Sequence, residues 1–505
     1  QLDEMSLRAK KIYPIASRCG VFAKSDIQPL LNQGARKEDI AASIFQAVVD
    51  QTITGLAQGR KIEGKVLFLG GPLSFLKGLQ LRFLQTLGLE EEHAVFPGLA
   101  PYFVALGSAY YAGNLSHQAA ISYRQLMEQL QREPAKTSAT HCLPPLFESQ
   151  EDYIDFKARH DARTVEHREM ASYSGRAFLG IDAGSTTTKL VLLDDEARIL
   201  YSHYVNNGGN PIPVILEQLK LIYHLCGDRI TIDASAVTGY GEELMKAAFG
   251  VDFGLVETVA HYTAARHFDP LVDFIIDIGG QDIKCFTVRD GAVDSIILNE
   301  ACSSGCGSFI ETFAKSLGYD IAEFSKLALF SKNPVDLGTR CTVFMNSSVK
   351  QAQKDGATVE DISAGLAISV IKNALYKVIR ARSAEELGEH IVVQGGTFLN
   401  NAVLRSFEQE LGRNVIRLSI SELMGAYGAA LYAMENGRET SSLINRKELA
   451  AFSHKAVAAT CHKCTNRCPL TVNTFADGRR FISGNKCERG AGADEAGNLP
   501  NLMGY

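Results

Sequence analysis

The stretch FLGIDAGSTTTKLVLLDD, residues 178–195, decides the fold that we expect for this chain. An apolar strand ends at Asp182, a turn of small residues follows, and a second strand with alternating apolar residues returns. Glycine and hydroxyl residues in such a turn let backbone N–H groups approach phosphate oxygens. An aspartate at the end of the strand can hold a hydrated Mg²⁺. An ordinary hairpin with a polar turn has the same pattern, so the prediction needs support from elsewhere in the chain.

Two later stretches repeat this pattern. FIIDIGGQDIKCFTV (274–288) is a buried strand that ends at Asp277, followed by a Gly-Gly turn and a returning strand, and a third Gly-Gly follows a strand and precedes a helix. One such element is common, but three in this order predict a site along which a nucleotide lies. The candidate catalytic residues are Asp182, Asp277 and Gln281, the last either positioning the attacking water or only shaping its turn. The candidate nucleotide contacts are Gly184, Ser185, Thr186, Thr187, Lys189, Gly279, Gly280, Gly395 and Gly396.

This ordered set resembles the acetate kinase/hexokinase/Hsp70/actin superfamily. The resemblance implies an α/β fold with two ribonuclease-H-like lobes that close over ATP and Mg²⁺. It places Asp182 in the first phosphate motif, Asp277 in the second, and Gly395 and Gly396 in the adenosine motif. The segment AVTGYGEELM (236–245) matches the connection between the two phosphate motifs.

The bulk composition is that of an ordinary globular protein. The 505 residues carry a net charge of -6, which does not favour a general nucleic-acid binder. No apolar run is long enough to span a membrane and no signal peptide is visible, so we expect no membrane partner and a cytoplasmic location.

The chain contains an internal repeat at long range. RCTVFMNSSVKQAQKDGATVEDI (340–362) matches RCGVFAKSDIQPLLNQGARKEDI (18–40) at an offset of 322 residues, without a gap. Residues 66–89 likewise parallel 391–412, and 105–114 parallel 426–437. We therefore predict a duplicated module whose first copy is truncated at its N-terminus. The expected domains are a partial first module at 1–114, a helical connector at 115–175, a complete ATPase module at 177–437, and a Cys-rich tail at 438–505.

Two cysteines of the complete module precede helical patterns. Cys302, in LNEACSSGCGSFIETFAKSLG (298–318), stands ahead of a Gly-rich turn, and Cys341 precedes the helical run 342–354. A helix N-terminus favours the thiolate, which is the form that binds iron. Each could equally be a small buried residue, but the repeat retains Cys19 in the setting of Cys341. A cubane usually takes four cysteines, and two modules with two each would supply them.

At this point the resemblance becomes more specific. GGQDIK, NEACSSGCGSFIE and RCTVFMNSS resemble the BadF/BadG/BcrA/BcrD ATPase family, the ATP-dependent activators of 2-hydroxyacyl-CoA dehydratases and related benzoyl-CoA reductase subunits. The resemblance implies one [4Fe–4S] cluster ligated by Cys302, Cys341 and Cys19, within a pseudo-dimer of the two modules or in a homodimer. Cys306 replaces the family's usual threonine and is either a further ligand or a bystander. The first copy lacks its counterpart of Cys302.

Four cysteines stand together in the tail. They have the spacing C-x₂-C-x₃-C-x₁₈-C, which favours a tetrahedral thiolate site that holds zinc or a second iron–sulfur cluster. The alternative is four free thiols. The four residues are Cys461, Cys464, Cys468 and Cys487.

These observations predict an ATP-hydrolysing iron–sulfur activator. It would inject low-potential electrons into a partner dehydratase or reductase that acts on an acyl-CoA. The alternatives are a small-molecule kinase of the sugar-kinase type and a nucleotide-gated binding protein without a redox role. Glu257 and His261, four residues apart on a predicted helix, are interpreted as packing or a surface pair.

Overall fold

The computed structural model divides the chain into two compact units. Unit 1 comprises residues 1–135, 456–473 and 482–505, and unit 2 comprises 136–455 and 474–481. The structure describes all residues except 16–25, 32–33, 58–61, 115–121, 132–141, 300–305, 340–341, 380, 382–383, 438–439, 464–466, 486 and 488–505.

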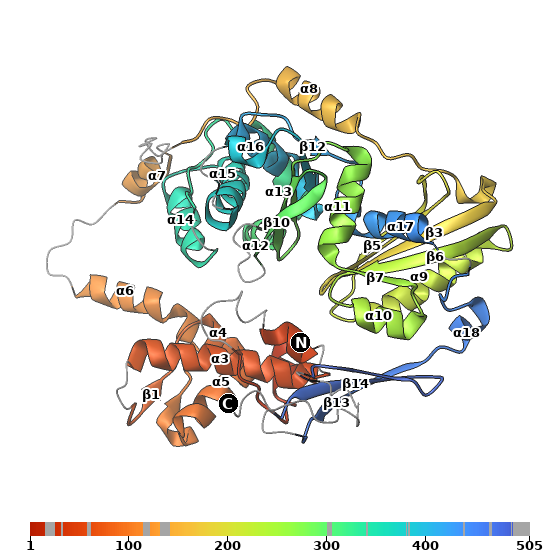
Figure 1. Cartoon of the computed structure of the whole chain (residues 1–505). Coiled ribbons are helices and arrows are strands. Elements are labelled where there is room, and N and C mark those ends of the chain that lie inside the picture. The colour runs from red at the N-terminus through yellow and green to blue at the C-terminus, as the bar shows by residue number, and fades with distance from the viewer. Residues whose placement is uncertain are drawn as a thin grey trace, which may run out of the picture. The chain divides into compact units, whose positions relative to one another are not determined.

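Unit 2 contains two five-stranded sheets with the same topology (Figure 1). Their orders are β5-β4-β3-β6-β7 and β10-β9-β8-β11-β12. In each sheet the first three strands along the chain are antiparallel neighbours, and the last two run parallel to the first. This topology is the ribonuclease-H-like arrangement, so the predicted α/β fold with two such lobes is confirmed.

The strands of the first sheet are β3 (Gly175–Ala183), β4 (Thr187–Leu193), β5 (Ile199–Asn206), β6 (Ile230–Thr238) and β7 (Phe253–Leu255). Those of the second sheet are β8 (Phe274–Ile278), β9 (Ile283–Arg289), β10 (Ala292–Asn299), β11 (Ile391–Gln394) and β12 (Ile416–Arg417). The helices associated with the first sheet are α9 (Pro211–Cys226), α10 (Glu242–Phe249) and α11 (Glu257–Phe268). Those of the second are α12 (Gly307–Ser316), α13 (Ile321–Leu327), α14 (Thr342–Lys354), α15 (Val359–Lys372), the π-helical η6 (Asn373–Ile379), η8 (Gly396–Leu399) and α16 (Asn401–Leu411).

Helix α17 (Met424–Asn436) follows the second sheet in the chain but packs against β3 and α11 of the first lobe. Its small residues make this close approach possible. A Cβ added at Gly180 of β3 would lie 1.9 Å from the Ala426 carbonyl oxygen, and one added at Gly428 would lie 1.8 Å from the Ala260 carbonyl oxygen. Backbone therefore meets backbone at this joint, and larger side chains would force the elements apart.

A connector helix is attached to the second lobe by ion pairs. Helix α8 (Gln150–Asp161) begins at Ser149, whose side chain accepts the Asp152 N–H. Arg405 of α16 donates to both carboxylate oxygens of Asp152, at 3.1 and 2.9 Å. Arg159 of α8 donates in turn to both oxygens of Glu408, each at 2.7 Å. These bidentate pairs fix the orientation of α8 along α16.

Unit 1 is smaller and is built around one long helix. The core of Phe45, Val49, Phe68, Leu79 and Phe83 joins that helix to a two-stranded parallel sheet and a following helix. The elements are α1 (Leu2–Ser6), α3 (Lys37–Ala57), β1 (Val66–Leu67), α4 (Gly71–Phe75), α5 (Lys77–Leu87), η1 (Glu91–His93), β2 (Ala94–Val95), η2 (Ala100–Tyr102), α6 (Phe103–Gly113) and α7 (Tyr123–Gln131).

Seven elements of unit 1 follow the order of elements within residues 321–436: α1, α3, β1, α4, α5, β2 and α6 correspond to α13, α15, β11, η8, α16, β12 and α17. Helix α3 covers 37–57, and α15 with η6 covers 359–379, at the offset of 322. Asp39 Oδ1 accepts the Lys11 N–H at 3.2 Å, and Asp361 Oδ1 accepts the Asn333 N–H, also at 3.2 Å. These pairs are separated by the same 322 positions.

The glycine turns of the two segments also agree. Gly70, after β1, has φ of 99° and ψ of 161°, and Gly395, after β11, has φ of 92° and ψ of 154°. Gly88 and Gly412, after α5 and α16, are both left-handed helix C-caps. Such backbone conformations favour glycine.

The tail contains more regular structure than its composition indicates. Helix α18 (Arg446–Ala450) precedes a three-stranded sheet in the order β13-β14-β15. The strands are β13 (His454–Thr460), β14 (Pro469–Phe475) and β15 (Arg480–Ser483).

Candidate active site

The two predicted catalytic aspartates occupy equivalent positions in the two lobes. Asp182 is in register with Lys189 on the neighbouring strand, and Asp277 is in register with Lys284. Both aspartates are buried, with 3% and 6% of their surface exposed. Each lobe therefore presents one carboxylate and one lysine on adjacent strands.

The lysines have different partners. Lys189 Nζ donates to Asp182 Oδ2 at 2.8 Å. Lys284 Nζ donates to Glu257 Oε1 and to Asp282 Oδ2, each at 2.6 Å. Asp277 is thus left facing His261, whose Nε2 lies 4.0 Å from Asp277 Oδ2.

The charges in this cluster stabilise one another. Burial alone would raise the pKa of Asp182, but the charge and hydrogen bond of Lys189 lower it below its usual value. Burial opposes the charged form of Lys189 and of Lys284, yet the neighbouring carboxylates raise the pKa of both lysines. Burial raises the pKa of Glu257, and Lys284 only partly offsets this effect. Lys189, Lys284 and Asp182 are consequently ionised at neutral pH, which suits a phosphate and metal site.

One carboxylate oxygen in this cluster has no protein partner. Asp182 Oδ1 is buried and accepts no hydrogen bond within the described part of the chain. A buried oxygen without a partner costs roughly 1–3 kcal/mol, and a hydrated Mg²⁺ would satisfy it. The donor set of Asp182 and Asp277 therefore fits Mg²⁺, which prefers carboxylate oxygens together with water and phosphate.

The first phosphate turn is held by an asparagine that the sequence did not single out. Asn207 Nδ2 donates to the Gly184 carbonyl at 2.9 Å and to Thr188 Oγ1 at 3.0 Å. The Asn207 N–H donates to the Thr186 carbonyl at 2.8 Å. These hydrogen bonds from Asn207 to carbonyl groups of the turn fix the shape of the turn. The candidate contacts Gly184, Ser185, Thr186, Thr187 and Lys189 all lie on this turn or at the start of β4.

The second phosphate turn is joined to the adenosine motif and to α12. The N–H groups of Gly307 and Ser308 donate to the carbonyls of Gly279 and Gly280, at 3.0 and 2.8 Å. Thr397 Oγ1 also donates to the Gly279 carbonyl, at 2.9 Å. The turn is thus bonded to the first residues of a helix on one side and to the segment after Gly396 on the other. Gln281 is half-buried in the same turn.

Close contacts explain two of the glycines around the aspartates. A Cβ added at Gly395 would lie 2.3 Å from the Ile278 carbonyl oxygen and 2.6 Å from Asp277 Oδ1. A Cβ added at Gly425 of α17 would lie 3.0 Å from Asp182 Oδ2 and 3.2 Å from His261 Nε2. The structure thus brings Asp182, Asp277 and the Gly395 turn to one place between the two lobes of unit 2.

Sequence reasoning set aside a pair that belongs to this place. Glu257 and His261 begin α11, both are largely buried, and Glu257 is a partner of Lys284. His261 Nδ1 is hydrogen-bonded to the side-chain oxygen of Gln394, whose Nε2 donates back to the His261 carbonyl at 3.1 Å. Gln394 immediately precedes Gly395, and this position next to the predicted adenosine motif was the one feature of the sequence that pointed to a role of Gln394 in the site.

Glu422 is a second residue that the sequence did not indicate. It follows Ser421, whose carbonyl accepts the Gly395 N–H at 2.7 Å. Its Cβ lies 3.9 Å from the Cβ position of Gly396. Burial raises the pKa of Glu422, and its Oε2 is buried without a partner in the described residues. This acceptor lies beside the predicted adenosine motif.

Most of the predicted cluster ligands cannot be compared with the structure. Cys19, Cys302, Cys341 and Cys464 lie outside the described residues. Cys306 is fully buried in the apolar core of the second lobe. In the tail, Cys461 and Cys468 are buried together with Leu470, and the Cys461 N–H donates to the Cys468 carbonyl at 2.8 Å, whereas Cys487 is exposed.

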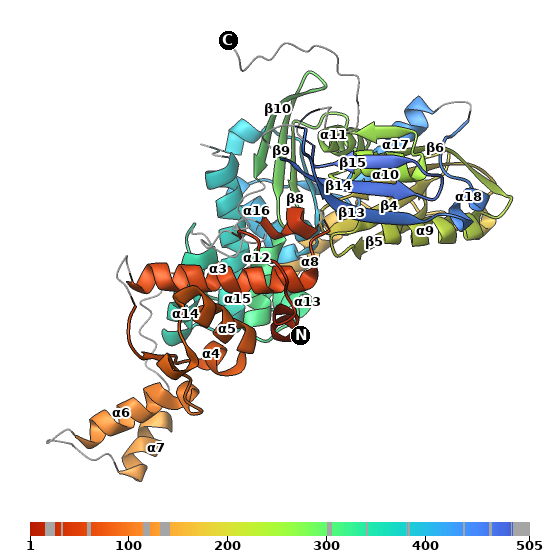
Figure 2. The same cartoon turned by 90° about the horizontal axis from the view of Figure 1, so that it is seen from below.

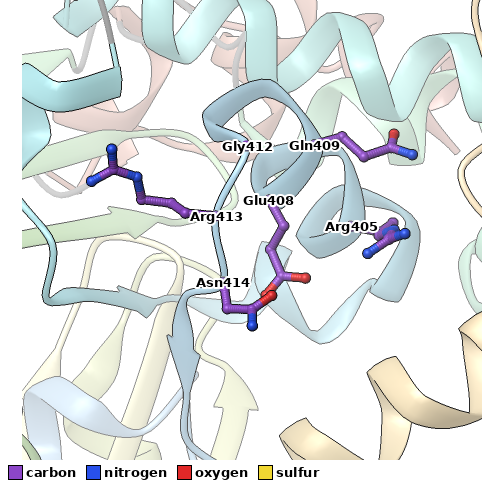
Figure 3. Close-up of a pocket in the computed structure, with 6 residues that line it drawn as sticks. All are labelled: Arg405, Glu408, Gln409, Gly412, Arg413 and Asn414. Atoms are coloured by element: carbon purple, nitrogen blue, oxygen red, sulfur yellow. The ribbon is translucent and has the colours of Figure 1, made fainter.

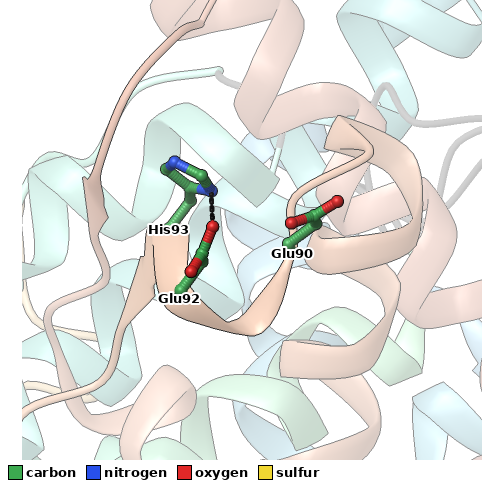
Figure 4. Close-up of side chains that lie close together, drawn as sticks. All are labelled: Glu90, Glu92 and His93. Atoms are coloured by element: carbon green, nitrogen blue, oxygen red, sulfur yellow. Dashed lines mark ion pairs between the residues drawn. The ribbon is translucent and has the colours of Figure 1, made fainter.

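Two further features lie away from this place. A pocket of about 290 Å³ lies at the C-terminal end of α16 (Figure 3), and its side chains Arg405 and Glu408 are engaged in the ion pairs with α8. In unit 1, the side chains of Glu90, Glu92 and His93 lie close together around η1 (Figure 4), and both glutamates are exposed. Exposed carboxylates of this kind are common without an ion. Among the described helices, none is long and apolar enough to cross a membrane.

The two lobes, the paired aspartates and the glycine turns define an actin-like ATPase module. The chain belongs to the BadF/BadG/BcrA/BcrD ATPase family, whose pattern matches residues 179–433. It is 33% identical over 266 residues to the 2-hydroxyisocaproyl-CoA dehydratase activator of Clostridioides difficile, covering 52% of this chain and 96% of the relative. It is 31% identical over 258 residues to the (R)-2-hydroxyglutaryl-CoA dehydratase activating ATPase of Acidaminococcus fermentans, covering 50% and 96%. The solved structure of the C. difficile activator with bound ADPNP covers 51% of this chain and 94% of its own, with 31% identity and a TM-score of 0.45.

Proposed function

We propose that this chain is an ATP-hydrolysing iron–sulfur activator that passes low-potential electrons to a dehydratase or reductase acting on an acyl-CoA. The observation that carries the proposal is the buried pair Asp182 and Asp277 with its two lysines, in a chain of this ATPase family. The relatives reported above are named as dehydratase activators, which favours an activator over a sugar kinase.

The residues of the cleft have distinct roles in ATP hydrolysis. Asp182 Oδ1 and Asp277 would hold Mg²⁺, which when bound neutralises charge on the phosphates. Lys189 and Lys284 keep their positive charge and so favour the anionic phosphates. Backbone N–H groups of the glycine turns would donate to the same oxygens, apart from those of Gly279 and Gly395, which donate to the carbonyls of Asp282 and Ser421. Gln281 remains our prediction for the group that positions the attacking water.

The second phosphate turn is suited to transmit the state of the nucleotide. It is bonded directly to Gly307 and Ser308, and the segment that carries Cys302 leads into these residues. A displacement of Gly279 and Gly280 would therefore move the beginning of α12. The family resemblance assigns a [4Fe–4S] cluster to Cys302, Cys341 and Cys19, and this assignment remains a prediction.

We further propose that residues 1–114 are the C-terminal part of a second copy of the module. The support is the shared element order, the hydrogen bonds of Asp39 and Asp361, and the matching conformations of Gly70 and Gly395. Two unrelated segments would have no reason to agree in all three. We also propose a pseudo-dimer of the two modules within the chain, a homodimer of chains and a cytoplasmic location.

For the tail, we propose a thiolate metal site that holds zinc or a second iron–sulfur cluster. Cys461 and Cys468 are buried neighbours joined by a backbone hydrogen bond, which is the proximity that paired thiolate ligands need.

The function is tested on the full chain, purified without oxygen and assayed for iron, acid-labile sulfide and ATP hydrolysis. Asp277→Ala is expected to lower the ATPase rate at least about 100-fold, with unchanged circular dichroism. Asp294→Ala, which changes an exposed aspartate of the same sheet, should retain the rate. In the presence of a reductant, the wild type should activate the C. difficile 2-hydroxyisocaproyl-CoA dehydratase only when ATP is present. A wild-type ATPase rate in Asp277→Ala would refute the cleft assignment, and absence of iron with ATP-dependent phosphorylation of a sugar would favour the kinase.

A further inference from the structure

A histidine and a glutamine link the two lobes of unit 2 beside the candidate site. His261 lies on α11, and Gln394 ends β11, where it is in register with Asp277. Both side chains are buried, with 4% and 0% of the residue surface exposed. Figure 2 shows α11 between the strands of the two sheets of unit 2, in agreement with Figure 1. The pair therefore joins a helix associated with the first sheet to a strand of the second.

The hydrogen bonds between these two residues fix the tautomer of His261. Gln394 Nε2 donates to the His261 carbonyl at 3.1 Å, and a carbonyl can only accept. The amide of Gln394 is thereby oriented with Oε1 toward His261 Nδ1, to which it is hydrogen-bonded. Since Oε1 is also only an acceptor, Nδ1 carries the proton. Nε2 is left as the ring nitrogen with a lone pair that can accept a hydrogen bond.

No donor reaches this nitrogen among the residues that the structure describes. Two carboxylate oxygens face Nε2, Glu257 Oε1 at 3.9 Å and Asp277 Oδ2 at 4.0 Å. Both distances exceed a hydrogen bond, and a carboxylate oxygen is itself an acceptor. Three acceptors around one space need a donor with more than one hydrogen, and a water molecule is such a donor.

The same space adjoins the aspartates that fit Mg²⁺. A Cβ added at Gly425 would lie 3.0 Å from Asp182 Oδ2 and 3.2 Å from His261 Nε2, so the absent side chain leaves these two atoms facing one volume. Mg²⁺ usually keeps several of its waters when carboxylates bind it. A water held by Mg²⁺ at these aspartates would supply the donor that Nε2 lacks.

We propose that His261 is a positioning residue for the hydrated metal. Its Nε2 accepts a hydrogen bond from a water that Mg²⁺ carries, and Gln394 fixes the tautomer in which it can do so. Partners outside the ligand shell orient what the metal holds, and their loss typically weakens metal binding about 10- to 100-fold. The inference rests on the proposed ATP site and adds to it a residue that touches neither the metal nor the nucleotide directly.

The alternative role of His261 is structural, in which it only ties α11 to β11 through Nδ1. Two substitutions give opposite results under the two roles. His261→Asn places an amide N–H near the position of Nδ1 and has no atom at the position of Nε2, whereas His261→Gln reaches the position of Nε2 with an amide oxygen but loses Nδ1. A metal role is therefore retained better by glutamine, and a purely structural role by asparagine.

The test measures how much Mg²⁺ increases the affinity for ADPNP. Isothermal titration calorimetry of the full chain, purified without oxygen, compares the affinity in Mg²⁺ with that in EDTA. His261→Asn should lower the increase at least about tenfold, with unchanged affinity in EDTA, and His261→Gln should retain most of the increase. The control His267→Asn, at an exposed histidine of the same helix, should match the wild type.

A further variant tests the part played by Gln394. Gln394→Met removes both hydrogen bonds to His261, so the effect of Mg²⁺ on ADPNP affinity should fall. It should not fall further when Gln394→Met is added to His261→Asn, because Gln394 acts through Nε2. Urea denaturation shows which variants are folded. If His261→Asn is not folded, the comparison of His261→Gln with Gln394→Met decides, since only the metal role predicts a larger effect of Mg²⁺ in His261→Gln.

Three results would overturn the inference. The first is an equal effect of Mg²⁺ in His261→Asn and the wild type, and the second is a smaller effect in His261→Gln than in His261→Asn. The third is a loss of affinity that is the same in Mg²⁺ and in EDTA, which would assign the pair a structural role only. A wild-type chain whose ADPNP affinity does not depend on Mg²⁺ would refute the proposed ATP site itself, so the two failures are distinguishable.

Discussion

Replacing Glu408 by glutamine should release α8 from the second lobe. Glu408 has only 3% of its surface exposed and accepts two hydrogen bonds of 2.7 Å from Arg159. Its Oε1 also accepts the Val415 N–H at 3.1 Å and lies 3.2 Å from His160 Nε2. Burial opposes the charge, but the hydrogen bonds of His160 and Arg159 lower the pKa of Glu408 from 4.5 to about 2.

The size of the effect follows from this pKa. A pKa lowered from 4.5 to about 2 corresponds to about 3 kcal/mol in favour of the charged folded form. Loss of one partner from a buried ion pair typically costs about 3–5 kcal/mol, which agrees. Glu408→Gln keeps the shape of the side chain and removes its charge. The local free energy of opening should therefore fall by about 3 kcal/mol, which raises the equilibrium constant for local opening roughly 100-fold.

Native-state hydrogen exchange of peptides from α8 and α16 measures this local free energy in the full chain. The matched control is Glu311→Gln, which removes an exposed i,i+4 partner of Lys315 at 2.6 Å and should cost no more than about 0.5 kcal/mol. The contribution of Glu408 is present above pH 4.5 and is lost as the pH falls toward 2, so the variant should lose that part of the pH dependence. Burial lowers the pKa of His160, so wild-type stability already begins to fall below pH 6.5. A change in α8 no larger than that of the control would refute the reasoning.

Three other outcomes can be checked with single substitutions or reagents. Gly425→Ala places a methyl group 3.0 Å from Asp182 Oδ2. It should raise the KM for ATP, measured by steady-state kinetics, and lower the free energy of unfolding by about 1–3 kcal/mol, measured by urea denaturation. An unchanged KM would contradict the placement of α17. Glu422→Gln should raise the KM for ATP roughly tenfold with kcat retained, because an amide replaces one of the two carboxyl oxygens beside the adenosine motif. Equal KM values would exclude a contact with the nucleotide. Treatment with a strong chelator should speed alkylation of Cys461 and Cys468, measured by mass spectrometry, and unchanged rates with no metal released would support free thiols.

The sequence was sufficient for the parts of the fold that depend on local pattern. The strands before Asp182 and Asp277 are apolar runs ended by turn residues, and the structure confirms both with their sheets. Burial of alternate or continuous apolar residues and the conformational freedom of glycine act over a few positions, so they can be recognised without a structure. The long-range repeat was also visible, since equal spacing needs no knowledge of contacts.

Contacts between distant elements could not be obtained in this way. Glu257 and His261 form an ordinary helical pair in the sequence, and only the packing of α11 against both lobes brings them to Lys284 and Gln394. The register of β9 fixed Lys284 opposite Asp277, but the short distances to Glu257 and Asp282 decided which carboxylates it binds. Which side chain pairs with a buried charge depends on distances set by the whole lobe.

The two helices α6 and α17 show the same division most clearly. Their sequences share small residues at the same positions, and from the sequence they are equivalent. In the structure α17 is buried against β3 and α11, whereas α6 is exposed, because the surface that an apolar helix needs is supplied by another part of the fold and not by the helix itself. The sequence determined that both segments form apolar helices, and only the tertiary structure decided that one is covered and that the other is exposed.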